Sequence, residues 1–327
     1  MINLLNLEPN KVSTDLSQYP MVWMGETGDG KTYSMNKYLT EISPEGKVPL
    51  FLMFEDRHKK IAGIMAQRVR SISDLYSVVS QFKNPKVKEK FSCVVIDTVD
   101  KFEEMASRYT ASNKEVEIIE DLNFGKGKRY LNGIMGIVSE FTKLGVTVHF
   151  ITQAYTNTDI ITKEKTVLTK LKDVTKAQIF HEAFLVGLIK KSPDSEERII
   201  TFKKTDIHRE LKDSFNLPDY IEISNLKNEI EKSFENIDPS MLTTEKTMVE
   251  VSEEVDFESI KKKGSELGEL LVNSGYLEEA MNVLKTTIGM DENGNAKMFD
   301  SLVESQIDTA KLVTLKLEEL VNKYNLG

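Results

Sequence analysis

The chain has 327 residues, of which 40% are hydrophobic and 29% charged, and this composition is typical of a globular protein with a substantial core. The chain has one cysteine, Cys93, which excludes an intrachain disulfide and a cysteine-rich zinc site. It has no apolar run of the roughly 18 residues that a membrane span needs. The first residues, MINLLNLEPNKV, show no signal-peptide pattern, so we expect a cytoplasmic protein with no membrane partner. The net charge of −9 by itself disfavours a nucleic-acid partner.

The first two-thirds of the chain alternates short apolar runs with longer amphipathic ones. The apolar runs are rich in β-branched and aromatic residues and predict strands at residues 21–24, 49–54, 91–96 and 146–151. The amphipathic runs predict helices at residues 31–41, 59–82, 98–108 and 128–144. Apolar strands that alternate with helices are typical of a parallel sheet covered on both faces, so we expect an α/β fold. Residues 183–191 and 198–204 predict an antiparallel hairpin added to this sheet.

The C-terminal part differs in charge and in pattern. Residues 228–327 hold 10 Lys and Arg against 21 Asp and Glu, a net charge of −11, which leaves +2 for residues 1–227. Amphipathic runs at 257–271, 277–288 and 298–321 predict three helices, as a small bundle or a partner-binding appendage. We therefore predict a core at 1–227, a linker at 236–256 and an acidic helical region at 257–327.

The strongest motif is GETGDGKT, residues 25–32, which matches G-x-x-x-x-G-K-[ST] between a predicted strand and a predicted helix. Its glycines let backbone N–H groups turn toward a phosphate, and the helix N-terminus adds partial positive charge. Lys31 is then placed to reach the β- and γ-phosphates of ATP, and Thr32 to bind Mg²⁺. We predict a nucleotide site, rather than an ordinary glycine turn, formed by Gly25, Glu26, Thr27, Gly28, Asp29, Gly30, Lys31, Thr32 and Tyr33.

Three further strands end in polar side chains. Asp97 follows an apolar run and is predicted to hold the magnesium as a Walker B residue; the alternative is a cap for the next helix, in which we expect Asp100 and Glu103 to face solvent. Glu55 ends the second strand and is the candidate general base or water positioner, if that strand neighbours the Asp97 strand, with a surface loop acid as the alternative. Gln153 ends the fourth strand as a sensor of the γ-phosphate or as a simple polar terminus.

In this order and spacing, GETGDGKT, the strand ending in Glu55, VVIDT and FITQ resemble the core of RecA-type ATPases. The resemblance covers about residues 18–225 and is closest to phage-encoded RecA-like ATPases, grouped with AAA-type proteins, that serve replication, recombination and single-strand annealing. It implies an ATP hydrolase that acts on single-stranded DNA in the host cytoplasm and assembles as a ring or filament. It also implies that Lys31, Glu55 and Gln153 are catalytic, that Thr32 and Asp97 hold Mg²⁺, and that Lys203 or Lys204 contacts a neighbour's nucleotide.

Basic residues follow the third and fourth strands. Basic side chains interleaved with an aromatic residue suit single-stranded DNA, although an ordinary solvated surface reads the same way. The candidate DNA contacts are Lys126, Lys128, Arg129, Tyr155, Lys163 and Lys165, within residues 125–129 and 154–176. We expect the acidic C-terminal helices to dock a partner, such as a single-strand-binding or replisome protein, or to shield the basic core. His149, in an apolar strand, is expected to be a hydrogen-bonded core residue.

Two other functions stay open. A nucleotide-gated binding module, such as a helicase loader with little turnover, is compatible with Thr98 standing where many P-loop ATPases have a glutamate next to the Walker B aspartate. A P-loop kinase for a small metabolite is less compatible, because such enzymes usually carry an arginine-bearing lid and residues 154–176 contain no arginine.

Overall fold

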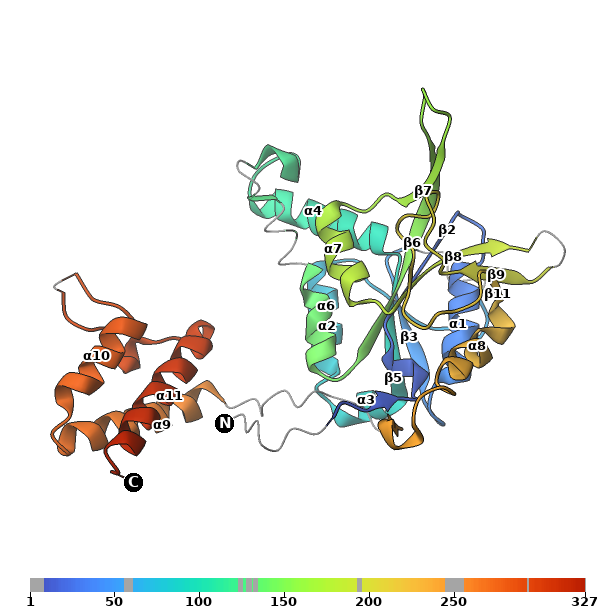
Figure 1. The fold of residues 1–327 in the computed structure, drawn as a ribbon. Helices are drawn as coiled ribbons and strands as arrows, with labels where there is room; N and C mark the ends of the chain where they lie inside the picture. The colour runs from blue at the N-terminus through green and yellow to red at the C-terminus, as the bar shows by residue number, and fades with distance from the viewer. Residues whose placement is uncertain are drawn as a thin grey trace. The chain divides into compact units, whose positions relative to one another are not determined.

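The computed structural model describes residues 9–55, 61–122, 126–127, 131, 135–192, 196–244, 256–292 and 294–326. The chain divides into two units (Figure 1). The larger unit takes in residues 8–247, and the smaller one residues 248–327 with residues 1–7.

A ten-stranded, mostly parallel sheet forms the centre of the larger unit, as the alternation of strands and helices predicts. Its continuous order is β11-β9-β8-β2-β6-β5-β3-β4, with β7 paired to β6 and β10 to β8. The strands that pair in parallel are β2 (Met21–Gly25), β3 (Val48–Met53), β4 (Met65–Arg68), β5 (Phe91–Asp97), β6 (Thr147–Thr158) and β8 (Leu185–Lys191). The antiparallel additions are β7 (Lys165–Thr169), β9 (Arg198–Thr201), β10 (Lys212–Asp213) and β11 (Ile221–Glu222).

Helices cover both faces of this sheet. One face carries α1 (Lys31–Ile42) and α8 (Leu226–Ser233) (Figure 1). The other carries α2 (Ile72–Gln81), α4 (Val99–Asn113), α6 (Ile137–Lys143) and α7 (Asp173–Glu182). Neighbours such as Val22 and Trp23 point to opposite faces and are both fully buried, which explains why the strands read as continuous apolar runs.

Residues 59–82 do not form the single helix that their amphipathic pattern predicts. They contain the edge strand β4 and then α2, which begins after Ser71. The Ser71 side chain accepts a hydrogen bond from the Asp74 backbone at 3.1 Å, and the Asp74 carboxylate accepts one from the Ser71 backbone at 3.1 Å. This capping box begins the helix at Ile72 and leaves the preceding residues free to pair with β3. A short helix, α3 (Pro85–Lys90), precedes β5.

The predicted linker at 236–256 is wrong over its first part. Residues 236–244 belong to the larger unit: a 3₁₀ turn at Pro239–Met241 leads into β12 (Leu242–Thr243), which pairs in parallel with β1 (Val12–Ser13). Ile237 also packs against the hydrophobic core on the α1 and α8 face of the sheet. Backbone pairing and an apolar contact thus hold a stretch whose composition resembles a linker, and residues 245–255 lie outside the described residues.

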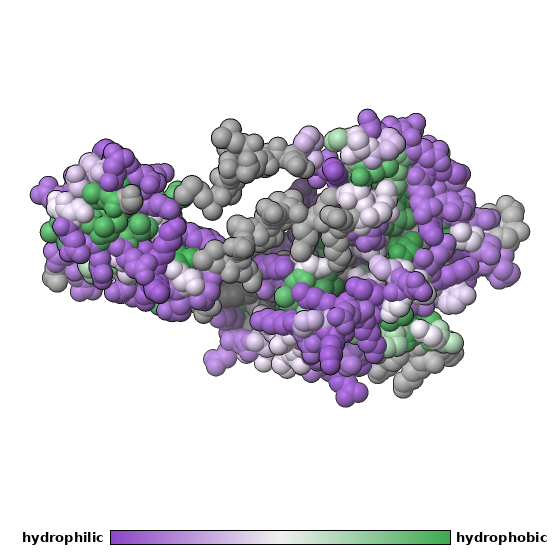
Figure 2. Space-filling model, turned by 90° about the horizontal axis from the view of Figure 1, so that it is seen from below, coloured by the Kyte–Doolittle hydropathy of each residue, from purple (hydrophilic) through white to green (hydrophobic). Residues whose placement is uncertain are grey.

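The smaller unit contains three helices, as the C-terminal pattern predicts: α9 (Phe257–Asn273), α10 (Leu277–Thr287) and α11 (Ile307–Lys323). The third begins nine residues later than predicted, after 3₁₀ turns at Phe299–Ser301 and Glu304–Gln306. They enclose a hydrophobic core of their own, which includes Leu271, Val313 and Leu317. Some large apolar residues stay exposed here, among them Met290 and Met298, and Figure 2 shows hydrophobic residues gathered within the otherwise hydrophilic surface of this unit. None of the helices in the described part of the chain has the length and apolar character of a membrane span.

Candidate functional site

The polar strand ends predicted from the sequence meet at one edge of the sheet. Met53 pairs with Asp97 across β3 and β5, and Gly25 pairs with Gln153 across β2 and β6. The Glu55 strand therefore neighbours the Asp97 strand, which is the condition on which the prediction for Glu55 depends. Because all these strands are parallel, their carboxyl ends open onto the same crevice.

The glycine-rich loop joins β2 to α1 and curls over its own lysine. Gly28 and Gly30 have positive φ angles of 99° and 81°, which explains glycine at these two positions. Lys31 is 8% exposed, and its Nζ donates to the backbone oxygens of Gly25 and Glu26 at 2.8 Å each. The Asp29 carboxylate closes the loop by accepting from the Glu26 backbone at 2.6 Å. The chain thus positions an ammonium group inside the glycine-rich loop, hydrogen-bonded to two of its carbonyl oxygens.

Thr32 and Asp97 meet across the crevice. The Thr32 hydroxyl donates to Oδ2 of Asp97 at 2.6 Å, and Asp97 is 4% exposed. Burial raises the pKa of Asp97 to about 6 and outweighs the lowering effects of the Thr32 hydrogen bond and the Lys31 charge, while Glu55 raises it further. The site therefore keeps a carboxylate in an environment that disfavours its charge.

These residues have the chemistry that Mg²⁺ prefers. Thr32 and Asp97 supply hard oxygen ligands, and the buried Thr98 hydroxyl beside them has no hydrogen-bond partner among the described residues. In the same part of the chain no group of three His, Cys, Asp or Glu side chains gathers as a metal site. The donor set therefore fits a magnesium ion that keeps phosphate and water ligands, and it does not form an all-protein cage.

A cavity of about 450 Å³ occupies this crevice. It contains nine of the predicted residues together with Met53, Ile61 and Thr98, and the remaining three, Gly25, Glu26 and Asp29, form the loop behind it. The residues lining it are Thr27, Gly28, Gly30, Lys31, Thr32, Tyr33, Met53, Glu55, Ile61, Asp97, Thr98 and Gln153. The structure therefore brings the predicted phosphate, metal, base and sensor residues into one cavity.

Asp100 and Glu103 do not face solvent as expected. Oδ2 of Asp100 accepts from the Thr152 hydroxyl at 3.0 Å and from the Gln153 backbone at 2.9 Å, and Glu103 is 7% exposed. Burial is also the main cause that raises the pKa of Asp100. The burial of Glu103 could have been predicted from its position, because it interrupts the apolar stripe that α4 turns toward the sheet.

The antiparallel strand β9 contributes a residue that the sequence did not single out. Nε of Arg198 donates to the backbone oxygen of Asp29 at 2.8 Å, and a Cβ atom on Gly30 would lie 3.0 Å from the same Nε. Arg198 thus supports the glycine-rich loop from outside. Lys203 and Lys204, the predicted interface residues, are both exposed, and Lys203 pairs with Asp219 at 2.5 Å.

Strand β6 is twice as long as predicted and continues past Gln153 into a hairpin with β7 (Figure 1). At its tip, the Asp159 carboxylate accepts from the backbones of Ile161 and Thr162 at 2.8 and 2.7 Å. Ile160 is 84% exposed and Ile161 is 90% exposed. The tip is therefore an ordered turn that presents two large apolar side chains to solvent.

The candidate DNA contacts divide between this hairpin and a second segment. Tyr155, Lys163 and Lys165 are exposed on the hairpin, and Nζ of Lys170 lies 6.0 Å from the centre of the Tyr155 ring. Lys126 is also exposed. The other two candidates, Lys128 and Arg129, lie outside the described residues.

His149 is buried without the hydrogen bonds expected for it. It is 0% exposed, and neither ring nitrogen has a partner among the described residues. Burial lowers its pKa to about 3, so the ring is neutral at pH 7.

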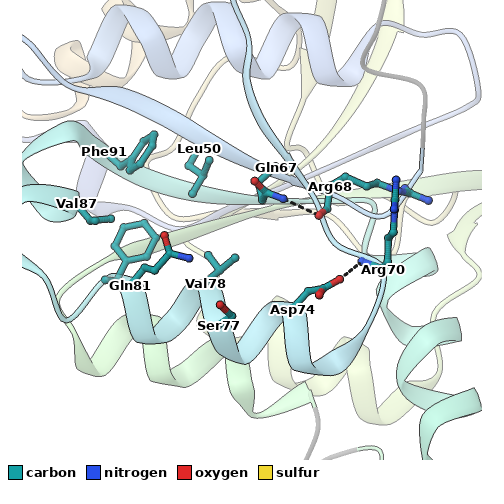
Figure 3. Close-up of a pocket in the computed structure, with 11 residues that line it drawn as sticks. Leu50, Gln67, Arg68, Arg70, Asp74, Ser77, Val78, Gln81, Val87 and Phe91 are labelled. Carbon is teal, nitrogen blue, oxygen red and sulfur yellow. Dashed lines mark hydrogen bonds between the residues drawn. The ribbon is translucent and has the colours of Figure 1, made fainter.

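A larger cavity of about 600 Å³ lies between β4 and α2. Figure 3 shows Arg68 and Arg70 at one end of it and the apolar side chains of Val87 and Phe91 at the other. The Arg70 backbone donates to the Asp74 carboxylate at 2.8 Å. This cavity contains none of the predicted site residues, nine of which line the smaller cavity at the strand ends.

Replacing Asp97 by Asn is expected to stabilise the nucleotide-free protein at pH 7.5. The pKa of Asp97 is higher in the folded chain than in the unfolded one, so the folded state loses stability as this carboxyl ionises between about pH 4 and pH 6. A shift of two pKa units corresponds to about 3 kcal/mol, and we expect a rise in Tm of about 6–12 °C. Thermal unfolding without metal at pH 7.5 and pH 4.5 checks this. A Tm difference between Asp97→Asn and wild type that is equal at both pH values would contradict this prediction.

Comparison with known proteins gives two matches. Residues 17–209 match a family model described as "AAA domain". A Bacillus subtilis (strain 168) protein, "SPbeta prophage-derived uncharacterized protein YorG", is 26% identical over 304 residues, covering 88% of this chain and 90% of that protein.

Proposed function

Because the chain belongs to the AAA domain family of P-loop ATPases, which implies nucleotide binding, we propose that it is a Mg²⁺-dependent ATPase that acts on single-stranded DNA. The observation that carries the proposal is the continuity of β6, which lines the nucleotide cavity at Gln153 and then forms the exposed hairpin. One strand thus reaches both a phosphate site and a surface suited to DNA. The similarity to a prophage-derived protein supports a role in phage replication, recombination or annealing.

The residues that line the cavity have different roles in the proposed hydrolysis. Lys31 and the loop N–H groups bind the phosphates, and Thr32 and Asp97 hold Mg²⁺, which when bound neutralises charge on the β- and γ-phosphates. Glu55 positions the attacking water or accepts its proton. Gln153 donates to the γ-phosphate and loses that contact after hydrolysis.

The β6–β7 hairpin is the proposed DNA contact. Lys163 and Lys165 neutralise phosphates, and Tyr155 offers an aromatic face for base stacking. Ile160 and Ile161 are the type of apolar side chain that inserts between base steps. Lys172 and Lys176 are left out of the contact because they pair with Glu120 and Glu210.

The double variant Lys163→Glu/Lys165→Glu is expected to bind a poly(dT) oligonucleotide about tenfold more weakly than wild type. Loss of two phosphate contacts on a single strand also lowers the slope of log K against log salt by roughly 1.4. Fluorescence anisotropy over a salt series measures both quantities. Lys83→Glu/Lys86→Glu is the matched control, because it makes the same charge change at exposed positions near α3. Equal losses in the two double variants would remove the hairpin from DNA binding.

The activity itself is tested by ATP hydrolysis at low salt with and without poly(dT). We expect Mg²⁺-dependent turnover that rises when DNA is added. Turnover that DNA leaves unchanged, together with no DNA binding, would contradict the DNA part of the proposal. ATP binding without turnover would favour the nucleotide-gated module, which Thr98 in place of a second carboxylate continues to support.

The acidic C-terminal unit is proposed to compete with DNA for the basic core. A chain that ends at residue 247, the boundary of the larger unit, keeps both core clusters of that unit and removes most of the acidic excess. We expect it to bind poly(dT) several-fold more tightly than the full chain at low salt, and equally at about 0.5 M salt, where charges are screened. Unchanged or weaker binding at low salt would mean that the acidic residues serve another partner.

We also propose that ATP is bound between protomers of a ring or filament. Lys203 and Lys204 are exposed on the segment after β9 and suit contact with a neighbour's nucleotide. Light scattering with and without ATP and single-stranded DNA measures the assembly directly.

A further inference from the structure

Helix α4 holds the nucleotide-sensing strand through a carboxylate. In its first turn, Oδ2 of Asp100 accepts from the Thr152 hydroxyl and from the Gln153 backbone N–H. Thr152 is 0% exposed, and these two residues are the last of β6 before the hairpin. The carboxylate therefore fixes the backbone of the residue whose side chain lines the nucleotide cavity.

A second carboxylate of the same helix holds the other end of the hairpin. Oε1 of Glu103 accepts from the Lys172 backbone N–H at 2.9 Å, just after β7 and just before α7. Asp100 and Glu103 are three residues apart and thus lie on the same face of α4. The hairpin is consequently anchored where it leaves the core and where it returns, by one helix.

These anchors are costly in free energy, which argues against a merely incidental arrangement. Glu103 is buried and Asp100 half-buried, and the hydrogen bonds to their carboxylates come from an uncharged hydroxyl and from backbone N–H groups. Asp100 also lies within the electrostatic field of Lys31 and Asp97. The helix that begins directly after Asp97 and Thr98 therefore connects the metal-binding end of β5 to both ends of the hairpin.

We propose that Asp100 is a positioning residue for Gln153, and that Asp100 and Glu103 together make α4 the link between the nucleotide and the hairpin. The consequence of this inference rests on the proposed function, because it makes α4 the route by which ATP changes the affinity of the hairpin for DNA. The contacts themselves do not depend on the proposed function, and hydrogen exchange tests them separately.

The first test separates the acceptor oxygen from the rest of the side chain. Asp100→Ala is expected to lower kcat for ATP by about 10- to 100-fold, with the Kd for ATP changed less than about threefold, because Gln153 is displaced while the phosphate loop is intact. Asp100→Asn keeps an oxygen for the same two donors and is expected to stay within about threefold of wild type. Glu104→Ala, on the exposed face of α4, is the control. A loss in Asp100→Ala no larger than in the control, or equal losses in Ala and Asn, would overturn the assignment.

The second test uses Glu103, which is not among the residues that line the nucleotide cavity. Glu103→Ala is expected to leave turnover without DNA within about twofold of wild type and to reduce its stimulation by poly(dT) at least about fivefold, whereas Glu103→Gln keeps the acceptor and the stimulation. Stimulation that is intact in Glu103→Ala would overturn the link to the hairpin, even if Asp100→Ala proves unable to fold.

The third test does not depend on turnover. In the nucleotide-free protein, Asp100→Ala is expected to speed amide hydrogen exchange at Gln153 by roughly tenfold or more, and Glu103→Ala to do so at Lys172, with exchange in β2 unchanged. Unchanged exchange at both amides would overturn the anchors. If these rates rise as expected but wild type shows no response to DNA, the proposed function fails and the anchors stand.

Discussion

A Lys31→Ala protein is expected to bind ATP at least about 100-fold more weakly than wild type and to show no measurable turnover. The Lys31 ammonium is buried beneath the glycine-rich loop, where it bonds to the oxygens of Gly25 and Glu26 and lines the nucleotide cavity. Its removal takes away the positive charge that we propose binds the β- and γ-phosphates, and also two hydrogen bonds that support the loop. Calorimetric titration with ATP and Mg²⁺ measures the loss.

Lys37→Ala is the matched control, because Lys37 is an exposed lysine on the same helix. It is expected to bind ATP like wild type. Comparison of the thermal unfolding of the two variants separates loss of the phosphate contact from loss of the fold. ATP affinity in a folded Lys31→Ala protein within threefold of the control would exclude the cavity as the nucleotide site.

A Glu55→Gln protein is expected to bind ATP within about threefold of wild type but to hydrolyse it at least about 100-fold more slowly. The amide keeps the size of the side chain but neither accepts a proton nor orients water as a carboxylate does. Single-turnover hydrolysis gives the chemical step, and equilibrium binding gives the affinity. Because this variant retains ATP, it is also expected to stay in the DNA-binding state of wild type with ATP.

Glu45→Gln, at an exposed turn before β3, is the control for the loss of one negative charge. Hydrolysis at the wild-type rate in Glu55→Gln would remove Glu55 from its proposed role. A wild-type protein that binds ATP but turns over no faster than Glu55→Gln would identify the nucleotide-gated module instead.

Strand positions could be predicted from the sequence because burial on both faces demands continuous apolar runs. The outer half of β6 is not buried on both faces, so it has no continuous apolar run from which a strand could be predicted. Beyond Ala154 the strand leaves the core, its residues alternate less clearly, and pairing with β7 holds it. Likewise β4 alternates exposed and half-buried residues at the sheet edge, a pattern that does not separate it from a helix over four residues.

The site could be predicted where its chemistry is local or follows from strand topology. The glycine-rich loop is a continuous motif, and Glu55, Asp97 and Gln153 each follow directly on an apolar run of a buried strand. Asp100, Glu103 and Arg198 could not be placed in this way, because their partners are backbone groups that are distant in the chain. Only the packing of α4 against β6 and of β9 against the loop brings these groups together.

The burial of Asp97 has a consequence for how this chain changes over generations. A carboxyl whose ionised form destabilises the folded protein is replaced by Asn with a gain in stability, and one base change in the Asp codon is enough. In a copy that no longer needs the proposed Mg²⁺ site, this side chain is therefore expected to be lost early. Related copies that keep aspartate at this position are expected to be those in which the proposed metal-binding role is still under selection.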